Sequence, residues 1–386
     1  MSHEFSTRCI HLPEEKDLKD RFGAISFPIY QTATFAHPGV GKSTGYDYAR
    51  SANPSRDYVE RIVASLENGT VALGFSSGMA AIALVMELFS PGDHLIVDYD
   101  LYGGSVRLFD HISKKNGLSF TKVDCARADL ESLITPQTKA IYLETPSNPM
   151  MRICDLRAIG ELAKRHGLLL IVDNTFLSPY LQNPLDLGAD VVVHSGTKYL
   201  GGHNDTLAGF LVVKDQALGD RLRFLQKTTG GTLSAFDAFL VTRGIKTLPL
   251  RMEKSQENAF ALAKWLKDRP EVTKVFYPGF EEHPGHEIHQ KQARGFGSML
   301  SFETATRELA ISLLENVRLI AYAESLGGTE TLLTYPLTQT HADIPEEERL
   351  AVGITDRLLR LSVGIEDVRD LMKDLEQAFE RAKASV

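Results

Sequence analysis

A lysine with two hydroxyl neighbours follows an apolar run in the segment "VVVHSGTKYLGGHND". Lys198 would lie just beyond a buried strand, where desolvation lowers the pKa of an amine and favours its neutral form. A neutral amine condenses with an aldehyde to form a Schiff base. Ser195 and Thr197 add hydroxyl donors suited to an anionic group, and Gly201-Gly202 permits close backbone approach. The segment predicts an activated lysine beside an anion site, and the alternative is a solvated turn lysine.

Three further segments supply partners for this lysine. In "GFSSGMAAIALVMELF" a small-residue turn opens an apolar helix, whose free N–H groups at Ser77, Gly78 and Met79 can bind phosphate. Ordinary serine capping is the alternative there. Asp173 ends an apolar run and can either cap the next segment or pair with a cationic ring nitrogen. Tyr102 follows another run and can lay its ring against a flat cofactor. Together with the lysine, these groups predict pyridoxal 5'-phosphate as the cofactor.

A nucleotide-binding loop is the competing account of these glycine-rich and serine-rich turns. That account requires a G-x-G-x-x-G or Walker pattern directly after a strand. Neither pattern occurs behind a strand-like run of this sequence. The sequence therefore favours the pyridoxal phosphate interpretation.

Apolar runs and amphipathic segments alternate between about residues 60 and 240. This alternation predicts an α/β domain with a mostly parallel sheet and helices on both faces. Ligands of such sheets bind at the carboxyl ends of the strands, where this chain carries Glu144, Asp173 and Lys198. The predicted strands are 94–100, 140–149, 168–176, 191–198 and 209–215, with a helix at 155–167.

The pattern changes after residue 240, where a long helical tract precedes shorter strand-like runs. The run "GFGSMLSFET" alternates like a strand with one face toward water, and "DVRDLMKDLEQAFERAKA" is an amphipathic helix. A chain of 386 residues exceeds one ordinary core and suggests two domains. We expect an arm at 1–55, a large cofactor-binding domain at 56–245 and a smaller C-terminal α+β domain at 246–386.

The charge balance and cysteine content limit the partners and the compartment. The chain has 42 basic and 50 acidic side chains, a net charge of −8, which argues against a nucleic-acid surface. No apolar run approaches the roughly 20 residues of a membrane span, and the N-terminus lacks the apolar core of a signal peptide. Cys9, Cys125 and Cys154 are far apart and odd in number. We therefore expect a reduced, cytoplasmic protein that binds neither nucleic acid nor a membrane.

Three histidines in "HPGHEIH" have a spacing that suggests a metal site. His283, His286 and His289 recur every third residue, but Pro284-Gly285 breaks the helix that would align them. No cysteine or paired carboxylate completes a coordination shell. The sequence predicts no metal site.

Seven motifs follow one another along the chain: "DYARSANPSR", "SSGMAAI", "YLETPSNP", "IVDNTF", "VVVHSGTKYLGGHND", "AESLGGTETL" and "RLLRLSVGIED". In order and spacing they resemble the Cys/Met-metabolism family of pyridoxal-phosphate enzymes, from about residue 5 to residue 380. This family includes cystathionine γ-synthases, cystathionine γ-lyases, cystathionine β-lyases and methionine γ-lyases. The resemblance implies the aspartate-aminotransferase-like fold (fold type I). It also implies a homotetramer built as a dimer of dimers, with active sites shared across each dimer.

The resemblance implies a role for each matching residue. Lys198 matches the Schiff-base lysine, Asp173 the partner of the pyridine nitrogen, and Tyr102 the stacking tyrosine that can assist proton transfer. Tyr48 and Arg50 match arm residues that reach into the neighbouring subunit's phosphate site. The family's phosphate-binding residues correspond here to Ser77, Gly78, Met79, Ser195 and Thr197. The residues that hold the substrate carboxylate in the family correspond to Asn148, Ser325 and Arg360.

Three positions bear on the family comparison and the substrate. Ala49 stands where the family usually has Ser or Thr. Gly104 stands where methionine γ-lyases resemble one another in having cysteine, which argues against methionine as the main substrate. Glu324 matches an acidic residue of the γ-synthases and γ-lyases, and it can attract the distal ammonium of cystathionine or of incoming cysteine.

We therefore expect a transsulfuration enzyme that acts on sulfur amino acids. Among the reactions of the family, we expect the γ-synthase reaction. In that reaction an O-acylhomoserine and cysteine combine by replacement at Cγ. The alternatives are cystathionine γ-lyase or β-lyase activity, followed by methionine γ-lyase activity. A catalytically inactive cofactor-binding relative is the non-enzyme alternative.

Overall fold

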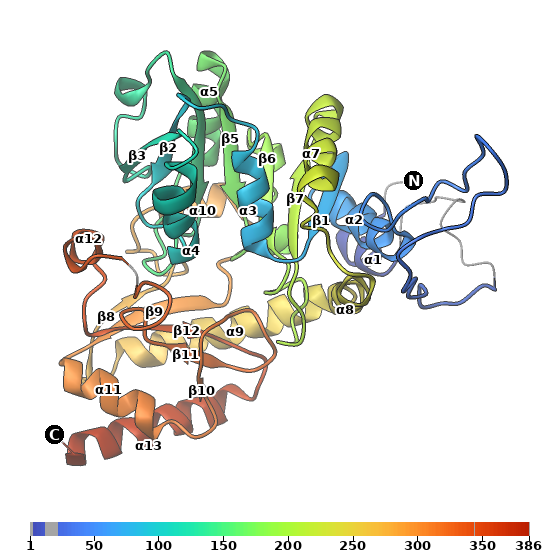
Figure 1. Cartoon of the computed structure of the whole chain (residues 1–386). Coiled ribbons are helices and arrows are strands. Elements are labelled where there is room, and N and C mark those ends of the chain that lie inside the picture. Colours follow the sequence, from blue (N-terminus) through green and yellow to red (C-terminus); the bar gives the residue numbers. More distant parts are fainter. Residues whose placement is uncertain (1–2, 12–21, 343, 386) are drawn as a thin grey trace.

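The computed structural model describes residues 3–11, 22–342 and 344–385. The chain forms a seven-stranded and a five-stranded β-sheet, each with helices packed against it, and an N-terminal arm projects to one side (Figure 1). The larger sheet is built from the N-terminal part of the chain and the smaller one from the C-terminal part. This architecture confirms the predicted α/β fold class.

The large sheet has the strand order β1-β7-β6-β5-β4-β2-β3. Neighbouring strands from β6 to β3 are parallel, whereas β7 is antiparallel to both of its neighbours. The carboxyl ends of the parallel strands therefore lie along one edge. The strands are β1 (Val71–Phe75), β2 (His94–Asp98), β3 (Ser119–Val123), β4 (Thr138–Glu144), β5 (Leu169–Asp173), β6 (Val191–Ser195) and β7 (Gly209–Val213).

Helices cover both faces of the large sheet (Figure 1). The helices of the first part are α1 (Phe5–Ile10), α2 (Pro54–Leu66), α3 (Gly78–Met86), α4 (Gly103–Arg107), α5 (Leu156–His166), α6 (Ser178–Leu181), α7 (Gln216–Thr229) and α8 (Ala235–Ile245). Those of the second part are α9 (Leu248–Lys267), α10 (His286–Gln292), α11 (Arg307–Asn316), α12 (Glu346–Ala351) and α13 (Val368–Ser385).

Alternate residues of the central strands enter two different hydrophobic cores. In β5, Leu170 and Val172 belong to the core that includes α2, α5 and α8. Ile171 belongs to the core that includes α3 and α7. Burial of both faces explains why these strands are continuously apolar rather than alternating.

The small sheet has the order β10-β11-β12-β9-β8 and is antiparallel except between β10 and β11. Its strands are β8 (Val272–Phe276), β9 (Met299–Thr304), β10 (Ala321–Tyr322), β11 (Leu332–Thr334) and β12 (Leu358–Ser362). Leu300 and Phe302 of β9 pack into the core formed with α9, α11 and α13.

The expectation that the β9 segment turns one face to water is wrong. Met299, on the alternate face, belongs to the core of the large sheet. Ser301 on that face is fully buried and donates from Oγ to Pro149 O at 2.8 Å. The face expected to meet water therefore meets the large domain, and its polar group is satisfied there.

Helix α9 connects the two parts of the chain. Leu248 and Met252, near its start, belong to a core of the large sheet, whereas Ala259 and Leu262, further along, belong to the core of the small sheet. The predicted boundary between residues 245 and 246 falls in the turn between α8 and α9. The three-part domain division remains a prediction.

Two further expectations concern cysteines and membranes. Cys9, Cys125 and Cys154 are all buried and unpaired by disulfides. In the part of the chain that the structure describes, no helix has both the length and the apolar character needed to cross a membrane.

Candidate active site

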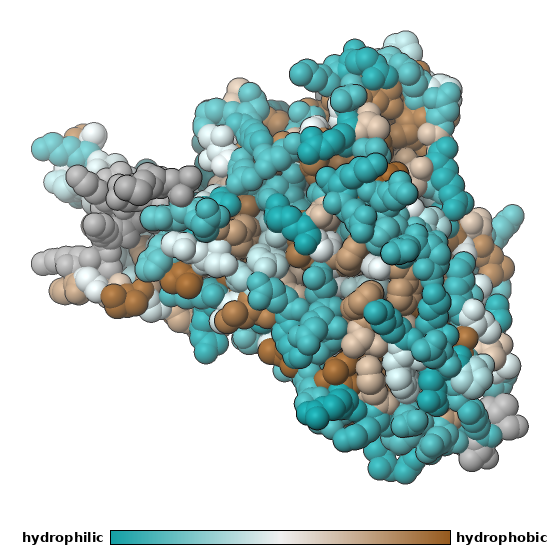
Figure 2. All heavy atoms as spheres, turned by 180° about the vertical axis from the view of Figure 1, so that it is seen from behind, coloured by the Kyte–Doolittle hydropathy of each residue, from teal (hydrophilic) through white to brown (hydrophobic). Residues whose placement is uncertain are grey.

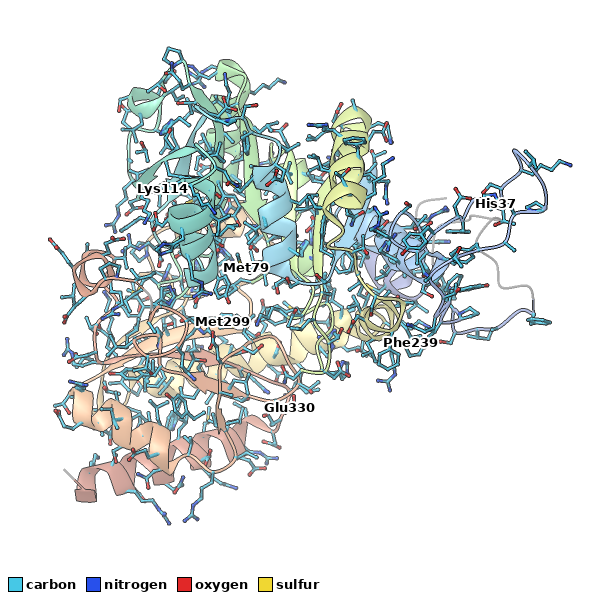
Figure 3. The ribbon with its side chains drawn as sticks, in the orientation of Figure 1. His37, Met79, Lys114, Phe239, Met299 and Glu330 are labelled. Carbon is cyan, nitrogen blue, oxygen red and sulfur yellow. The ribbon has the colours of Figure 1, made fainter. Side chains whose placement is uncertain are left out.

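A cavity of about 190 Å³ lies at the carboxyl ends of the parallel strands, where the large and small domains meet. Figure 3 shows Met79 of α3 on one side of this junction and Met299 of β9 on the other. All predicted site residues line the cavity except two arm residues. The predicted lining residues are Ser77, Gly78, Met79, Tyr102, Asn148, Asp173, Ser195, Thr197, Lys198, Glu324, Ser325 and Arg360.

Lys198 follows β6 after a two-residue turn. Its Nζ donates a hydrogen bond to Ser325 Oγ at 2.8 Å. Burial, followed by repulsion from Arg360, lowers the pKa of the amine from 10.5 to about 8, and attraction to Glu324 opposes this shift. The amine can therefore lose its proton close to neutral pH, as a nucleophile or a general base must.

Two carboxyl groups stand next to each other at the ends of β4 and β5. Glu144 and Asp173 are register partners in the parallel ladder. Burial raises the pKa of both groups, and repulsion by Asp173 raises the pKa of Glu144 further. Asp173 Oδ1 accepts from Thr175 N at 2.9 Å. Glu144 Oε1 accepts from Tyr102 N at 2.9 Å, so it fixes the backbone of the predicted stacking tyrosine.

A hydroxyl-rich corner forms where the start of α3 meets the end of β6. Ser77 caps α3 with its side chain. A Cβ on Gly78 would lie 3.0 Å from Ser195 Cβ, so glycine is what allows this close approach. Thr197 Oγ1 accepts from Ala208 N at 3.0 Å. A helix N-terminus with converging hydroxyl groups is suited to bind a phosphate.

A buried guanidinium enters the cavity from the small domain. Arg360 of β12 is 1% exposed, and its Nη1 donates to Asn148 Oδ1 at 3.0 Å. Burial lowers its pKa to about 10, and attraction to Glu324 opposes this shift. Among the described residues, no atom accepts a hydrogen bond from Arg360 Nε. A buried cation with a free donor is suited to bind a carboxylate.

Ser325 connects the lysine to this guanidinium. Its Oγ accepts from Lys198 Nζ at 2.8 Å, and its backbone O accepts from Arg360 Nη2 at 2.9 Å. The φ angle of Ser325 is 140°, which residues other than glycine rarely adopt. Strained backbone of this kind is typical of functional sites.

Glu324 is exposed at the cavity, and its charge acts on Lys198, Arg360 and Tyr102.

Gly104, at the start of α4, lies directly against the predicted stacking tyrosine. A Cβ on Gly104 would overlap the Tyr102 ring and would lie 2.9 Å from Met79 Sδ. A side chain at this position would therefore displace the ring.

Tyr48 and Arg50 lie in the arm, outside the lining of the cavity. Arg50 Nη1 donates to Lys227 O of α7, and Arg50 Cζ lies 5.5 Å from the centroid of the Tyr48 ring. A single chain does not bring these residues to the site. Their role in a neighbouring subunit remains a prediction.

Glu144, which the sequence placed at a ligand-binding strand end without a role, lines the cavity. Other lining residues were not expected from the sequence: Ile82, Pro146, Thr175, Phe176, Leu207, Leu326 and Thr340. Thr175 lies just beyond the end of β5, and this position was the signal that could have identified it. Thr340 belongs to the small domain, and nothing in its local sequence indicates the contact.

The three histidines of "HPGHEIH" lie outside this lining. His286 Nδ1 is 2.7 Å from Pro278 O, and His289 Nε2 is 2.8 Å from Gly295 O. Within the described ranges, no group of three potential ligands could hold a metal ion.

The groups around the cavity fit pyridoxal phosphate. The aldehyde requires a neutral amine, and Lys198 has a lowered pKa. The phosphate requires donors, which the start of α3 and the hydroxyls of Ser195 and Thr197 provide. The ring nitrogen requires a carboxylate, and Asp173 lines the same cavity.

Comparison with known proteins agrees with this chemistry. The model of the Cys/Met metabolism PLP-dependent enzyme family matches residues 6–380. A cystathionine gamma-synthase of Haemophilus influenzae is 51% identical over 366 residues, which cover 94% of this chain and 95% of that protein. A cystathionine gamma-lyase of Bacillus subtilis strain 168 is 49% identical over 362 residues, covering 94% of this chain and 96% of that protein.

A solved structure gives the same result for the fold. The cystathionine gamma-lyase of Lactobacillus plantarum complexed with L-serine superposes with a TM-score of 0.96 and 46% identity, covering 99% of this chain and 100% of that one. The family match spans nearly the whole chain, and the matches cover 96% and 95% of the two relatives. The chain therefore belongs to the Cys/Met metabolism family of pyridoxal-phosphate-dependent enzymes and is an enzyme of transsulfuration.

Proposed function

We propose that the protein is a cystathionine γ-synthase. In this reaction the sulfur of cysteine bonds to Cγ of an O-acylhomoserine, the Cγ–O bond breaks, and the acyl group leaves as a carboxylic acid. The observation that carries the proposal is an outer cavity of about 740 Å³ that shares Thr197, Leu207, Glu324 and Ser325 with the inner one. Two adjacent cavities suit two substrates that must be present together.

The inner cavity suits the amino-acid end of the first substrate. Bound pyridoxal phosphate supplies an electron sink for negative charge at the substrate Cα. Arg360 and Asn148 bind the α-carboxylate, with the free Nε of the guanidinium as an additional donor. Lys198 accepts the Cα proton, gives it up again to the cofactor-bound substrate, and can then accept a proton from Cβ.

Tyr102 and Glu324 act at the far end of the substrate. Burial holds the pKa of Tyr102 above its ordinary value of 10, so the phenol stays protonated and can donate to the leaving acyl oxygen. Glu324 lines both cavities and holds the ammonium of the incoming cysteine.

Cystathionine γ-lyase activity is the second candidate. Glu324 favours it too, because cystathionine carries an ammonium group at its far end. Gly104 argues against methionine γ-lyase activity in either case. In this chain, a side chain at this position would displace the Tyr102 ring.

Replacement of Glu324 tests this account of the site. Glu324→Gln removes one charge with little change in size. It should lower kcat/KM for cysteine as acceptor, or for cystathionine, by about 5- to 150-fold, the loss of roughly 1–3 kcal/mol for a charge-assisted hydrogen bond. Elimination from methionine, or from an O-acylhomoserine without thiol, should change less than about twofold, because these substrates carry no distal ammonium.

The matched control is Glu330→Gln, measured with the same substrates. Glu330 is an exposed acid that accepts from Asn204 Nδ2 at 2.8 Å but lines neither cavity (Figure 3). An equal loss in both variants would mean that general charge at the cavity mouth, rather than Glu324 itself, attracts the acceptor.

We further propose that the enzyme is a homotetramer in which Tyr48 and Arg50 serve the neighbouring chain. Large apolar side chains are exposed on and near the arm, including Phe22, Ile25, Val40, Phe236 and Leu250. Figure 2 shows apolar residues at the surface beside the base of the projecting arm. Exposed apolar surface of this kind supports a subunit interface.

A further inference from the structure

A second interdomain cavity of about 650 Å³ shares no lining residue with the active-site cavity. Its walls come from the segments 124–127 and 150–153 of the large domain, from β8, and from residues 280–285 of the small domain. The volume lies within the roughly 300–1,000 Å³ of small-molecule sites. We refer to it as the β8 cavity.

One cation of the β8 cavity has no acidic partner. The acidic lining residues are already paired: Asp124 Oδ2 lies 2.9 Å from Arg152 Nη1, and Glu282 pairs with Lys267. Lys274 has no carboxylate within ion-pair distance among the described residues, and its Nζ lies 4.4 Å from the centroid of the Phe276 ring. Its charge is therefore available to an anion.

A buried histidine lines the same cavity. His283 is 9% exposed, and within the described chain its Nδ1 has no hydrogen-bond partner. Burial, then repulsion from His289, lowers its pKa to about 4, so the ring is neutral at pH 7. An unpaired buried polar atom is destabilising, and a ligand atom bonded to Nδ1 removes that cost.

Part of the remaining lining is apolar. Phe276 and Phe280 are at most 9% exposed, and Ile153 from the large domain is 3% exposed. All three line the β8 cavity. An apolar body with one anionic group matches this combination of aromatic walls, a free ammonium and an unpaired imidazole nitrogen.

We propose that the β8 cavity is a regulatory site for a small carboxylate with an aromatic body. The carboxylate binds Lys274 and His283, and the body packs against Phe276, Phe280 and Ile153. A ligand seated there contacts both domains at once.

The β8 cavity is connected to the active site by a short segment. Met150 lines the cavity, and two residues earlier Asn148 accepts from Arg360 Nη1 at 3.0 Å. Between them, Pro149 O accepts from Ser301 Oγ at 2.8 Å. A ligand that holds the domains together stabilises this arrangement and so lowers the KM for the amino-acid substrate. This consequence rests on the proposed carboxylate-binding role of Arg360, whereas binding to the β8 cavity does not.

The test uses the holoenzyme with 2-naphthoate as the probe, titrated by calorimetry. Lys274→Ala should weaken binding roughly tenfold, the loss of one charge-assisted hydrogen bond, and Lys274→Glu should abolish it. Lys264→Ala is the matched control, because Lys264 Nζ lies 4.1 Å from the Phe260 ring in the same kind of contact but outside the cavity. It should bind as tightly as the unmodified enzyme.

Unchanged affinity in both Lys274 variants would overturn the proposal, as would displacement of 2-naphthoate by the amino-acid substrate.

In the unmodified enzyme, 2-naphthoate should lower KM at least twofold for whichever substrate is turned over, with no effect in Lys274→Glu. Binding that leaves KM unchanged would refute the coupling to Asn148. The calorimetric measurement of 2-naphthoate binding does not depend on which reaction the enzyme catalyses. The proposed β8 site and the proposed γ-synthase function can therefore be refuted independently of each other.

Discussion

Lys198 acquires its reactivity from its position just beyond a buried strand. Burial and the nearby Arg360 favour the neutral amine, and Ser325 Oγ holds its Nζ at 2.8 Å. The sequence could predict this because "VVVHSGTK" places the lysine directly behind an apolar run. The role of Glu144 could not be predicted in the same way. Its bond to Tyr102 N depends on the spatial arrangement of β4 and the segment that follows β2.

The lowered pKa of Lys198 predicts how cofactor binding depends on pH. Only the neutral amine reacts with the aldehyde, and its fraction reaches one half at the pKa of about 8. Between pH 7 and 10, the rate at which the apoprotein takes up pyridoxal phosphate should rise with a midpoint at about pH 8 and level off at about pH 9. Stopped-flow absorbance measures this rate. A rate that keeps rising to pH 10 would show that the amine has its ordinary pKa.

At the scale of elements, strands with two buried faces were the easiest to predict. β2, β4, β5, β6 and β7 each appear as an apolar run, because helices cover both sides of the sheet. β3 was not predicted, since none of its residues is fully buried and its apolar signal is weak. The surroundings of β9 were predicted wrongly, because alternation does not distinguish water from a second domain. Ser301 meets Pro149 O where solvent was expected.

The start of α4 gives a test at this scale. Gly104→Ala places a Cβ where the Tyr102 ring lies, and a small misplacement of a reacting group can lower turnover by roughly 100-fold. We expect kcat to fall by about 10- to 100-fold while cofactor absorbance is retained. In a Tyr102→Ala background the same change should have little further effect, because the two residues act through one ring.

A suitable control for this substitution is Gly39→Ala. A Cβ at Gly39 would meet Lys42 Cδ at 3.6 Å, an ordinary contact. Full activity of Gly104→Ala would mean that the Tyr102 ring has room to move, and the argument against a side chain at this position would fail.

At the scale of the whole molecule, the elements around the two sheets combine to form the site. α9 enters the cores of both sheets, and Arg360 of the small domain donates to Asn148 of the large one. The change in sequence pattern after residue 240 indicated a second group of elements, which form the small sheet, whereas contacts such as that of Thr340 required the folded chain. The arm residues Tyr48 and Arg50 are left outside the cavity of their own chain.

Subunit exchange tests whether the arm serves a neighbouring chain. Arg50→Ala and Lys198→Ala should each lose most of their activity. After mixing, a hybrid dimer has one site with both residues intact, so random exchange should restore about a quarter of the sites. Native mass spectrometry verifies the exchange. Absence of recovery in an exchanged sample would mean that Arg50 acts within its own chain.

Identification of products tests the central claim, cystathionine synthesis at Cγ, most directly. The holoenzyme receives O-acetyl- or O-succinylhomoserine with cysteine, and in separate reactions cystathionine alone and methionine alone, and mass spectrometry measures each product over time. The account predicts that formation of cystathionine from the first mixture has the highest kcat/KM. Faster release of cysteine and 2-oxobutanoate from cystathionine would establish a γ-lyase instead. Homocysteine with pyruvate as the fastest products would mean β-cleavage, and methanethiol as the fastest product would contradict the interpretation of Gly104.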